Sequence, residues 1–235
     1  MKFVLLHGAW MGGWCWRDVA RLLRQAGHDV HTPTFTGLGE RAHLLHAGVR
    51  LSTFIDDVSG LIECEELDDI VLVGHSFGAM VACAVADRMG QVVRHLILVD
   101  GLVARHGQSA LAVLPPPLQA QRGHTDDPEE LRMPVPDPAQ FGVVEPAQVA
   151  WVKRHMRPHP LNAYTEPLVL RHPLGNGLPV TYIAATQPWY APLAPVRDMV
   201  KLQPGWRWRE LPVCHAPMID APALLAQELL AIAAS

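Results

Sequence analysis

The chain has 235 residues, of which 49% are hydrophobic and 18% charged, a composition that supports a sizeable core and excludes a disordered chain. This length fits one α/β domain with an insertion. The 19 basic and 23 acidic side chains give a net charge of −4, and no basic run or patch indicates a nucleic acid or a membrane surface as a partner.

The N-terminus and the cysteines predict a compartment. The apolar run in residues 1–8 is too short for a signal peptide, and no stretch approaches the roughly 20 apolar residues of a transmembrane helix. The four cysteines are scattered without metal-ligand spacing, which favours reduced thiols. We therefore expect a cytoplasmic protein with no membrane partner, and a homodimer remains open as its assembly.

Strands alternate with helices in the first hundred residues. The order is strand 3–6, helix 16–25, strand 29–32, helix 52–67 with Ser52 as its N-cap, strand 70–73, helix 77–89 and strand 95–99. Such alternation indicates a mostly parallel sheet with helices on both faces.

The alternation breaks in a proline-rich segment. Short helices are predicted there around 146–155 and 162–170, before the pattern resumes with strands 180–185 and 206–211 and helix 221–234. So long an excursion inside an α/β domain is typical of a functional lid. We therefore divide the chain into a first core part (1–104), an inserted lid, or cap (105–178), and a second core part (179–235).

The pentapeptide from Gly74 to Gly78 carries the strongest chemical signal. Gly-x-Ser-x-Gly is common as a bare pattern, but here a buried strand enters it and an alanine-rich helix leaves it. That context predicts a nucleophile, Ser76, on a tight strand-to-helix turn, with an ordinary turn as the alternative. The Phe77 amide would then lie at a helix N-terminus, where it can stabilise an oxyanion.

A serine nucleophile requires a base and an acid. Among 13 histidines, His215 occupies the loop between the last strand and the last helix, where chain order places the base. The loop after strand 180–185 holds no carboxylate. Asp100 ends the strand that follows the nucleophile helix, at the same sheet edge as Ser76, and is the predicted acid. Asp198, in a predicted helix, is the alternative.

The loop after the first strand is predicted to complete the site. The Ala9 amide is a candidate second oxyanion donor, and Trp10 beside it is a candidate substrate contact. His7 is expected to be a structural hydrogen-bonding residue. His155 and His159 have helical metal-ligand spacing, but Pro158 breaks that geometry and no third ligand is evident, so we expect no metal.

These residues resemble the α/β-hydrolase superfamily, and most closely the branch of plant methylesterases, hydroxynitrile lyases and their small bacterial esterase relatives. The resemblance rests on residues 7–16, 33–41 and 74–78 and on the His215 loop. It implies ester hydrolysis without a cofactor. Plant members carry their acid in the late loop that lacks one here. Cys214 precedes the base where a small or acidic residue is usual, and Ala216 follows it where hydroxynitrile lyases place a lysine, which argues against cyanide chemistry.

The sequence therefore predicts a serine hydrolase that cleaves small, fairly apolar carboxylic esters through an acyl-enzyme, with amide or carbamate cleavage also open. In the alternative, a lyase or cofactor-independent oxygenase, His215 and Asp100 abstract a proton and Ser76 only binds. A non-catalytic receptor on the same fold is disfavoured, because a receptor has no need of all three residues.

Overall fold

The computed structural model describes residues 1–123 and 132–234. Its main sheet has six strands in the order β2-β1-β3-β4-β7-β8, and neighbouring strands are parallel. Their bounds are β1 (Lys2–Leu6), β2 (Asp29–His31), β3 (Ile70–His75), β4 (Val93–Val99), β7 (Val180–Ala185) and β8 (Arg207–Leu211). This confirms the six predicted strands and the predicted α/β class.

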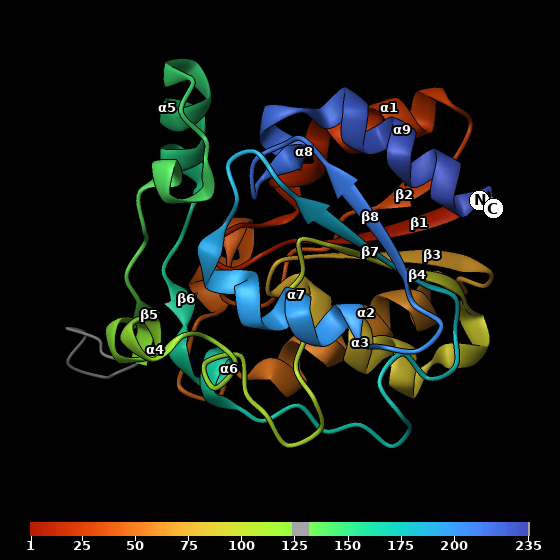
Figure 1. Ribbon diagram of the computed structural model, residues 1–235, viewed down its shortest axis with the longest axis horizontal. Helices are drawn as coiled ribbons and strands as arrows, with labels where there is room; N and C mark the ends of the chain where they lie inside the picture. The colour runs from red at the N-terminus through yellow and green to blue at the C-terminus, as the bar shows by residue number, and fades with distance from the viewer. Residues whose placement is uncertain (124–131, 235) are drawn as a thin grey trace.

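Helices cover both faces of the sheet (Figure 1). One face carries α1 (Arg17–Gln25) and α9 (Pro222–Ala233), which pack side by side. The other carries α2 (Leu51–Cys64), α3 (Gly78–Arg88) and α7 (Ala194–Lys201). No helix in the described ranges is long and apolar enough to cross a membrane.

The start of α2 corrects one prediction. Its N-cap is Arg50, whose amide donates to Thr53 Oγ1 over 3.1 Å, and Ser52 lies inside the first turn. Ser52 is held instead by Glu166, which accepts from its amide (2.7 Å) and its hydroxyl (3.1 Å). A carboxylate from a distant segment thus occupies the helix N-terminus, where free amides favour negative charge. The sequence around residue 52 gives no sign of that partner.

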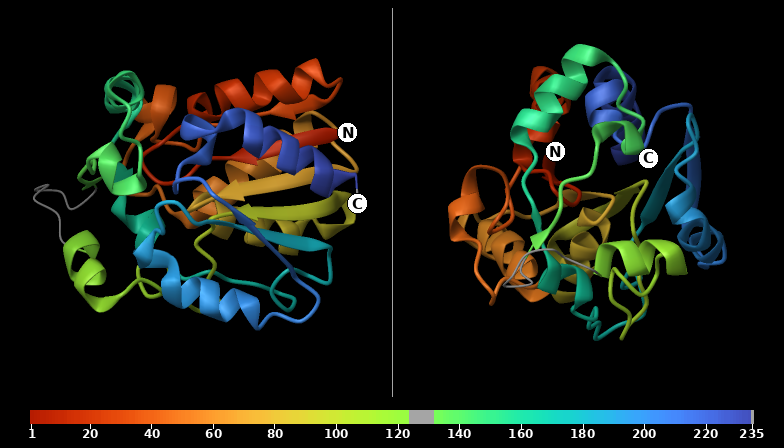
Figure 2. Two further views of the ribbon diagram at one scale, coloured as in Figure 1. Left: turned by 45° about the horizontal axis from the view of Figure 1, so that its top comes forward. Right: turned by 90° about the vertical axis from the view of Figure 1, so that its left-hand side faces the viewer.

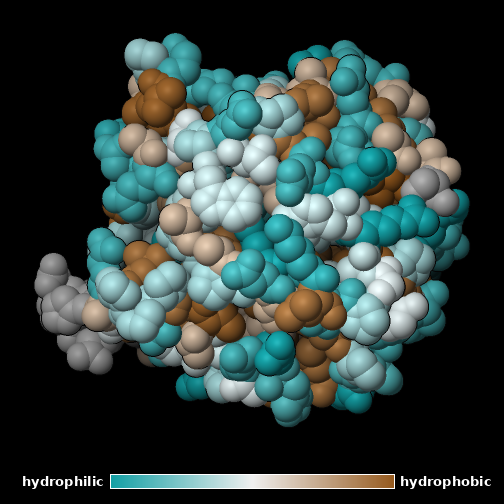
Figure 3. Space-filling model, in the orientation of Figure 1, coloured by the Kyte–Doolittle hydropathy of each residue, from teal (hydrophilic) through white to brown (hydrophobic). Residues whose placement is uncertain are grey.

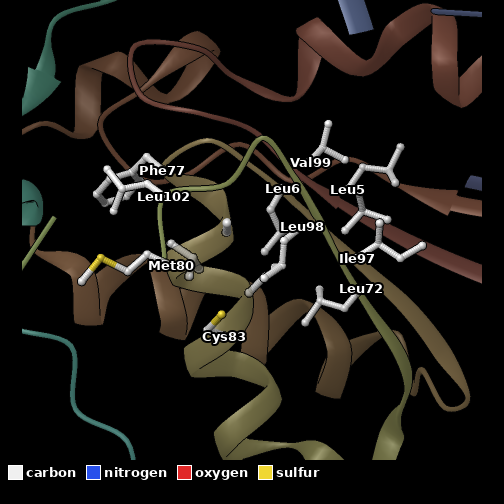
Figure 4. Close-up of a cluster of buried hydrophobic side chains, with 14 of the residues drawn as sticks. Leu5, Leu6, Leu72, Phe77, Met80, Cys83, Ile97, Leu98, Val99 and Leu102 are labelled. Carbon is white, nitrogen blue, oxygen red and sulfur yellow. The ribbon is translucent and has the colours of Figure 1, made fainter. Parts of the chain in front are cut away.

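The core packs against both faces of the central strands, and α3 covers one of these faces. Figure 4 shows side chains of β1, β3 and β4, such as Leu5, Leu72 and Ile97, together with Met80 of α3. Each of them is fully buried. On the face shown in Figure 3, hydrophobic residues form small separate patches among hydrophilic ones. Most of the apolar side chains that the composition predicts for a core are therefore buried between the sheet and its helices.

The segment between β4 and β7 forms a cap. Its elements are α4 (Pro116–Gly123), β5 (Arg132–Met133), the 3-10 helix η4 (Pro138–Phe141), α5 (Pro146–His155), β6 (His159–Pro160) and α6 (Leu161–Thr165). They gather at the end of the molecule away from both termini, where the carboxyl ends of the strands point (Figures 1 and 2). Residues 124–131 of the predicted lid lie outside the described residues.

Two details of the cap differ from expectation. Helix α6 ends at Thr165, five residues before the predicted end, because Glu166 precedes a proline and adopts an extended conformation. The antiparallel pair β5-β6 was not predicted, since strands of two residues leave no periodicity in the sequence.

Candidate functional site

Ser76 lies on the turn between β3 and α3, with a φ of 50°. The turn has no room for side chains at its flanking glycines. A Cβ on Gly74 would meet Gly78 O at 2.6 Å, and one on Gly78 would meet His7 O at 2.5 Å. The Ser76 amide donates to Val99 O of β4 over 3.1 Å. The neighbouring strand therefore fixes this strained residue.

His215 connects Ser76 to Asp100. Its Nε2 lies 3.1 Å from Ser76 Oγ, and its Nδ1 lies 2.6 Å from Asp100 Oδ2. With the proton on Nδ1, the imidazole donates to the carboxylate and accepts from the serine hydroxyl. Asp100 and His215 are buried, whereas Ser76 is partly exposed. The three residues predicted from sequence therefore form one continuous chain of hydrogen bonds.

The Asp100 carboxylate is held on both oxygens. Besides His215 on Oδ2, its Oδ1 accepts from Arg197 Nη2 (2.5 Å) and Nε (3.2 Å) and from the Ala185 amide (3.3 Å). Burial by itself would raise the pKa of this carboxyl, but the hydrogen bond and charge of His215 and the charge of Arg197 lower it overall. Asp100 is therefore ionised beside His215.

Arg197 is the main contact that sequence reasoning missed. It lies on α7 beside Asp198, and its side chain is 1% exposed. The sequence carries no signal that this arginine points inward. Asp198, the alternative acid, is exposed on the same helix. Its exposure removes it from the hydrogen-bonded chain.

Two rings also missed by sequence reasoning hold the base. His75 Nε2 donates to the His215 carbonyl over 2.7 Å, and burial lowers the His75 pKa to about 3, so this imidazole is neutral. The Tyr190 ring stacks on the His215 ring with centroids 4.0 Å apart and an interplanar angle of 16°. His215, the predicted base, is thus fixed at its backbone and on one ring face.

The first loop brings Ala9 close to the turn at Phe77, since β1 and β3 are paired neighbours. In the described turns and loops, neither the Ala9 nor the Phe77 amide is the donor of a backbone hydrogen bond. His7 beside them accepts from the Phe35 amide over 3.1 Å, and burial lowers its pKa to about 4. It is a neutral hydrogen-bonding residue, as expected.

Trp10 joins this loop to the cap. Its φ is 63°, its amide donates to His159 Nδ1 over 3.4 Å, and its carbonyl accepts from the Arg157 amide over 2.9 Å. Trp10 also lines a pocket of about 250 Å³, whose other described lining residues belong to the cap. Trp10 therefore links the first loop to the cap, and its role as a substrate contact stays a prediction.

The predicted metal-like pair is separated by the fold. His155 Nδ1 lies 2.7 Å from Trp151 O within α5, whereas His159 is buried in β6 against Trp10. Within residues 1–123 and 132–234, no group of three or more histidines, cysteines or acids could hold a metal ion. The two histidines act separately.

A serine on a strand-to-helix turn, hydrogen-bonded to a histidine and through it to an aspartate at the same sheet edge, defines the class of α/β hydrolases. The chain belongs to the alpha/beta hydrolase family, whose model matches residues 3–228. This confirms the resemblance drawn from the motifs.

Similar proteins have hydrolase names. The chain is 44% identical to a carbendazim hydrolyzing esterase of Nocardioides sp. (strain SG-4G), over 98% of this chain and 99% of that protein. It is 29% identical to methylesterase 10 of Arabidopsis thaliana, over 56% of this chain and 46% of that protein.

Solved structures share the fold. An extracellular alpha/beta-hydrolase from a Paenibacillus species superposes with a TM-score of 0.86 at 23% identity, covering 99% of this chain and 98% of that one. A pyrethroid hydrolase from Sphingobium faniae JZ-2 has a TM-score of 0.73 at 21% identity, with coverages of 100% and 98%.

Proposed function

We propose that the protein is a serine hydrolase that cleaves small carboxylic esters through an acyl-enzyme intermediate. The observation that carries this proposal is the chain of hydrogen bonds from Ser76 through His215 to Asp100. The full-length similarity to a protein named an esterase supports the same reaction.

The geometry suits each step of acyl transfer. Ser76 Oγ attacks the ester carbonyl while His215 Nε2 takes the hydroxyl proton, and Asp100 stabilises the resulting imidazolium. The amides of Ala9 and Phe77 are proposed to hold the oxyanion. The intermediate collapses as His215 returns the proton to the departing alcohol. A water then attacks the acyl-enzyme with His215 as its base, which frees the acid and Ser76.

The cap is proposed to act as the lid that shapes the substrate site. Its Phe141 ring lies 5.9 Å from the His215 ring, and its Tyr164 ring lies 5.2 Å from Phe77, centroid to centroid. Aromatic walls this close favour compact, fairly apolar groups. Ser76 could attack the carbonyl of a carbamate in the same way as that of an ester. Because the Nocardioides relative is named for carbendazim, carbamates should be tested as substrates beside the esters.

The cysteines support the expected reducing, cytoplasmic compartment. All four are free thiols, and three of them are buried: Cys15, Cys83 and Cys214. Burial raises the pKa of Cys15 and Cys83, and it is the main cause of the raised pKa of Cys214. Such thiols are unreactive, so they are suited to a structural role.

The test is turnover of aryl and methyl esters of short and long acids by the wild type, Ser76→Ala and the matched control Ser109→Ala. We expect Ser76→Ala to lose about 10³-fold or more in kcat, and the control to keep full activity. An organophosphate should add once per chain, and mass spectrometry should locate it on Ser76. Retained turnover in Ser76→Ala would favour the lyase or oxygenase reading, in which His215 and Asp100 act without the serine.

A further inference from the structure

Arg122 brings a positive charge into the cap beside the proposed active site. It lies near the end of α4 and is partly buried. Its Nη1 donates to the Tyr164 hydroxyl over 2.7 Å, and its Nη2 donates to the Tyr190 hydroxyl over 3.0 Å. Its Cζ lies 4.9 Å from the centroid of the Trp10 ring. Three aromatic side chains therefore fix the guanidinium.

Each of those rings is in contact with a different part of the site. Tyr190 stacks on the base, His215, and Tyr164 stacks on Phe77 at an interplanar angle of 20°. Trp10 directly follows Ala9 in the chain. The guanidinium is thus one ring away from the base and from both proposed oxyanion donors. Trp10 is shared by this contact and by the pocket beside Arg122.

The charge of Arg122 is not balanced by any carboxylate that the structure describes. Its two hydrogen-bond acceptors are phenols, and burial is the main cause of the raised pKa of Tyr164, which keeps that phenol neutral. A guanidinium has five N–H donors, so three remain beyond the two that the tyrosines accept. Arg197, the other arginine near the triad, has Asp100 as its counter-ion. Among residues 1–123 and 132–234, Arg122 therefore has a charge without a carboxylate partner.

The pocket beside Arg122 can admit a ligand group. It measures about 250 Å³, and its lining includes Trp10, Leu118, Arg122, Met133 and Gln140. Asp137 also lines it, but that carboxylate is bound to Lys153 Nζ over 2.7 Å and accepts from the Ala139 amide. An incoming anion would therefore meet the guanidinium beside the Trp10 ring, with Gln121 and Gln140 also in the lining. A charge-assisted hydrogen bond to the guanidinium is stronger than one between neutral groups.

We propose that Arg122 binds a carboxylate at the far end of the acyl group, so that the preferred substrates are monoesters of dicarboxylic acids. This inference rests on the proposed ester hydrolysis. The ester carbonyl lies at Ser76 and the distal carboxylate at Arg122. Hydrolysis then releases the alcohol and leaves a dicarboxylate. The site combines aromatic side chains with one cation. The apolar substrates predicted from sequence are therefore narrowed to esters that carry a carboxylate at the far end of an apolar acyl chain.

The test compares methyl esters that differ only at the far end of the acyl chain. Monomethyl adipate carries a carboxylate there, its monoamide carries a neutral hydrogen-bonding group, and methyl hexanoate carries a methyl group. Monomethyl succinate and glutarate vary the length. The enzymes are the wild type, Arg122→Gln, Arg122→Lys and Arg154→Gln, which removes an exposed cation from the cap elsewhere.

We expect the wild type to prefer one of the carboxylate esters at least tenfold in kcat/KM over methyl hexanoate. Arg122→Gln should abolish that preference mainly through KM, Arg122→Lys should keep part of it, and Arg154→Gln should keep all of it. Added salt should weaken the preference. An equal loss on all three adipate-length esters in Arg122→Gln, or equal rates for the amide and the carboxylate in the wild type, would overturn the proposal.

A binding measurement separates this inference from the proposed function. Calorimetry would titrate adipate into Ser76→Ala with and without Arg122→Gln. Binding that is lost with the arginine supports the anion site even if no ester is hydrolysed. Adipate that binds neither variant, while methyl hexanoate is hydrolysed through Ser76, would overturn the site and leave the esterase proposal standing.

Discussion

Arg197 and His215 bind opposite oxygens of one carboxylate. Arg197 donates to Asp100 Oδ1 from two nitrogens, and His215 donates to Oδ2. The arginine thereby supports the proposed acid from α7, the helix that follows β7 in the chain. Hydrogen bonds to both oxygens fix the plane of the carboxylate and therefore the orientation of the imidazole, which in the proposed mechanism receives the serine proton.

Replacing the acid should leave the fold and reduce the rate. Asp100→Asn keeps the shape of the side chain but removes the charge that stabilises the imidazolium, so we expect kcat on a short ester to fall by about 10²–10⁴-fold. Asp198→Asn, an exposed acid one residue from Arg197, is the matched control and should retain wild-type activity. Steady-state kinetics check both. Near-full activity in Asp100→Asn would show that the acid lies elsewhere.

Breaking the buried ion pair from its other side should cost stability. Arg197→Met leaves the buried Asp100 carboxylate with His215 and the Ala185 amide as its remaining partners. Removing one partner of a buried pair costs about 3–5 kcal/mol of unfolding free energy. Urea denaturation measures this loss. In the double variant Asp100→Asn/Arg197→Met the loss should be smaller than the sum of the two single losses, and strict additivity would show that the pair is not coupled.

Two glycines should respond in opposite ways to alanine. A Cβ on Gly78 would lie 2.5 Å from His7 O and 2.8 Å from Leu6 O, which are backbone atoms of the β1 region and cannot move freely. We expect Gly78→Ala to lower the unfolding free energy by about 1–3 kcal/mol and to disturb the nucleophile turn. Gly60 in α2 meets no atom within 4 Å, so Gly60→Ala should raise stability by about 0.5–1 kcal/mol. Thermal unfolding of the two variants tests both signs.

Acid should weaken the fold partly through His75. Burial lowers the folded-state pKa of His75 to about 3, below the ordinary value of 6.5 for the unfolded chain. Between these values the unfolded chain binds a proton that the folded chain does not, so stability falls as the pH drops from 6.5 toward 3. His75→Gln should reduce that slope by up to about 1.4 kcal/mol per pH unit. The exposed control His43→Gln should leave the slope unchanged in urea unfolding at pH 7, 6 and 5.

The parts of this protein that sequence predicts well are those that local pattern determines. Apolar runs located the strands to within a few residues. The glycines around Ser76 had to be glycines because a Cβ on either would lie within 3 Å of backbone atoms. Asp100 could be inferred because parallel strands end at one edge of the sheet. In each case the local sequence pattern, or the pairing of adjacent parallel strands, was sufficient for the prediction.

The contacts that sequence did not predict depend on long-range packing. Arg197 looks like any surface arginine in a short helix, and only the tertiary fold turns it toward Asp100, 97 residues away. The same holds for Glu166 at the start of α2 and for Arg122 between two tyrosines. A single sequence gives no signal for such pairs, because each residue taken alone is of a type commonly found at its position in a helix or loop.

The placement of the acid at the end of β4 has a consequence for how this enzyme can diversify. The proposed nucleophile, Ser76, and the proposed acid, Asp100, directly follow adjacent strands, which the hydrogen bond from the Ser76 amide to the Val99 carbonyl joins. Residues 186–190, which follow β7, therefore supply no member of the proton relay. Tyr190 must stay, because its ring stacks on His215. Mutations at residues 186–188 leave the proposed relay and that ring in place, so selection can vary this part of the loop while the relay stays intact.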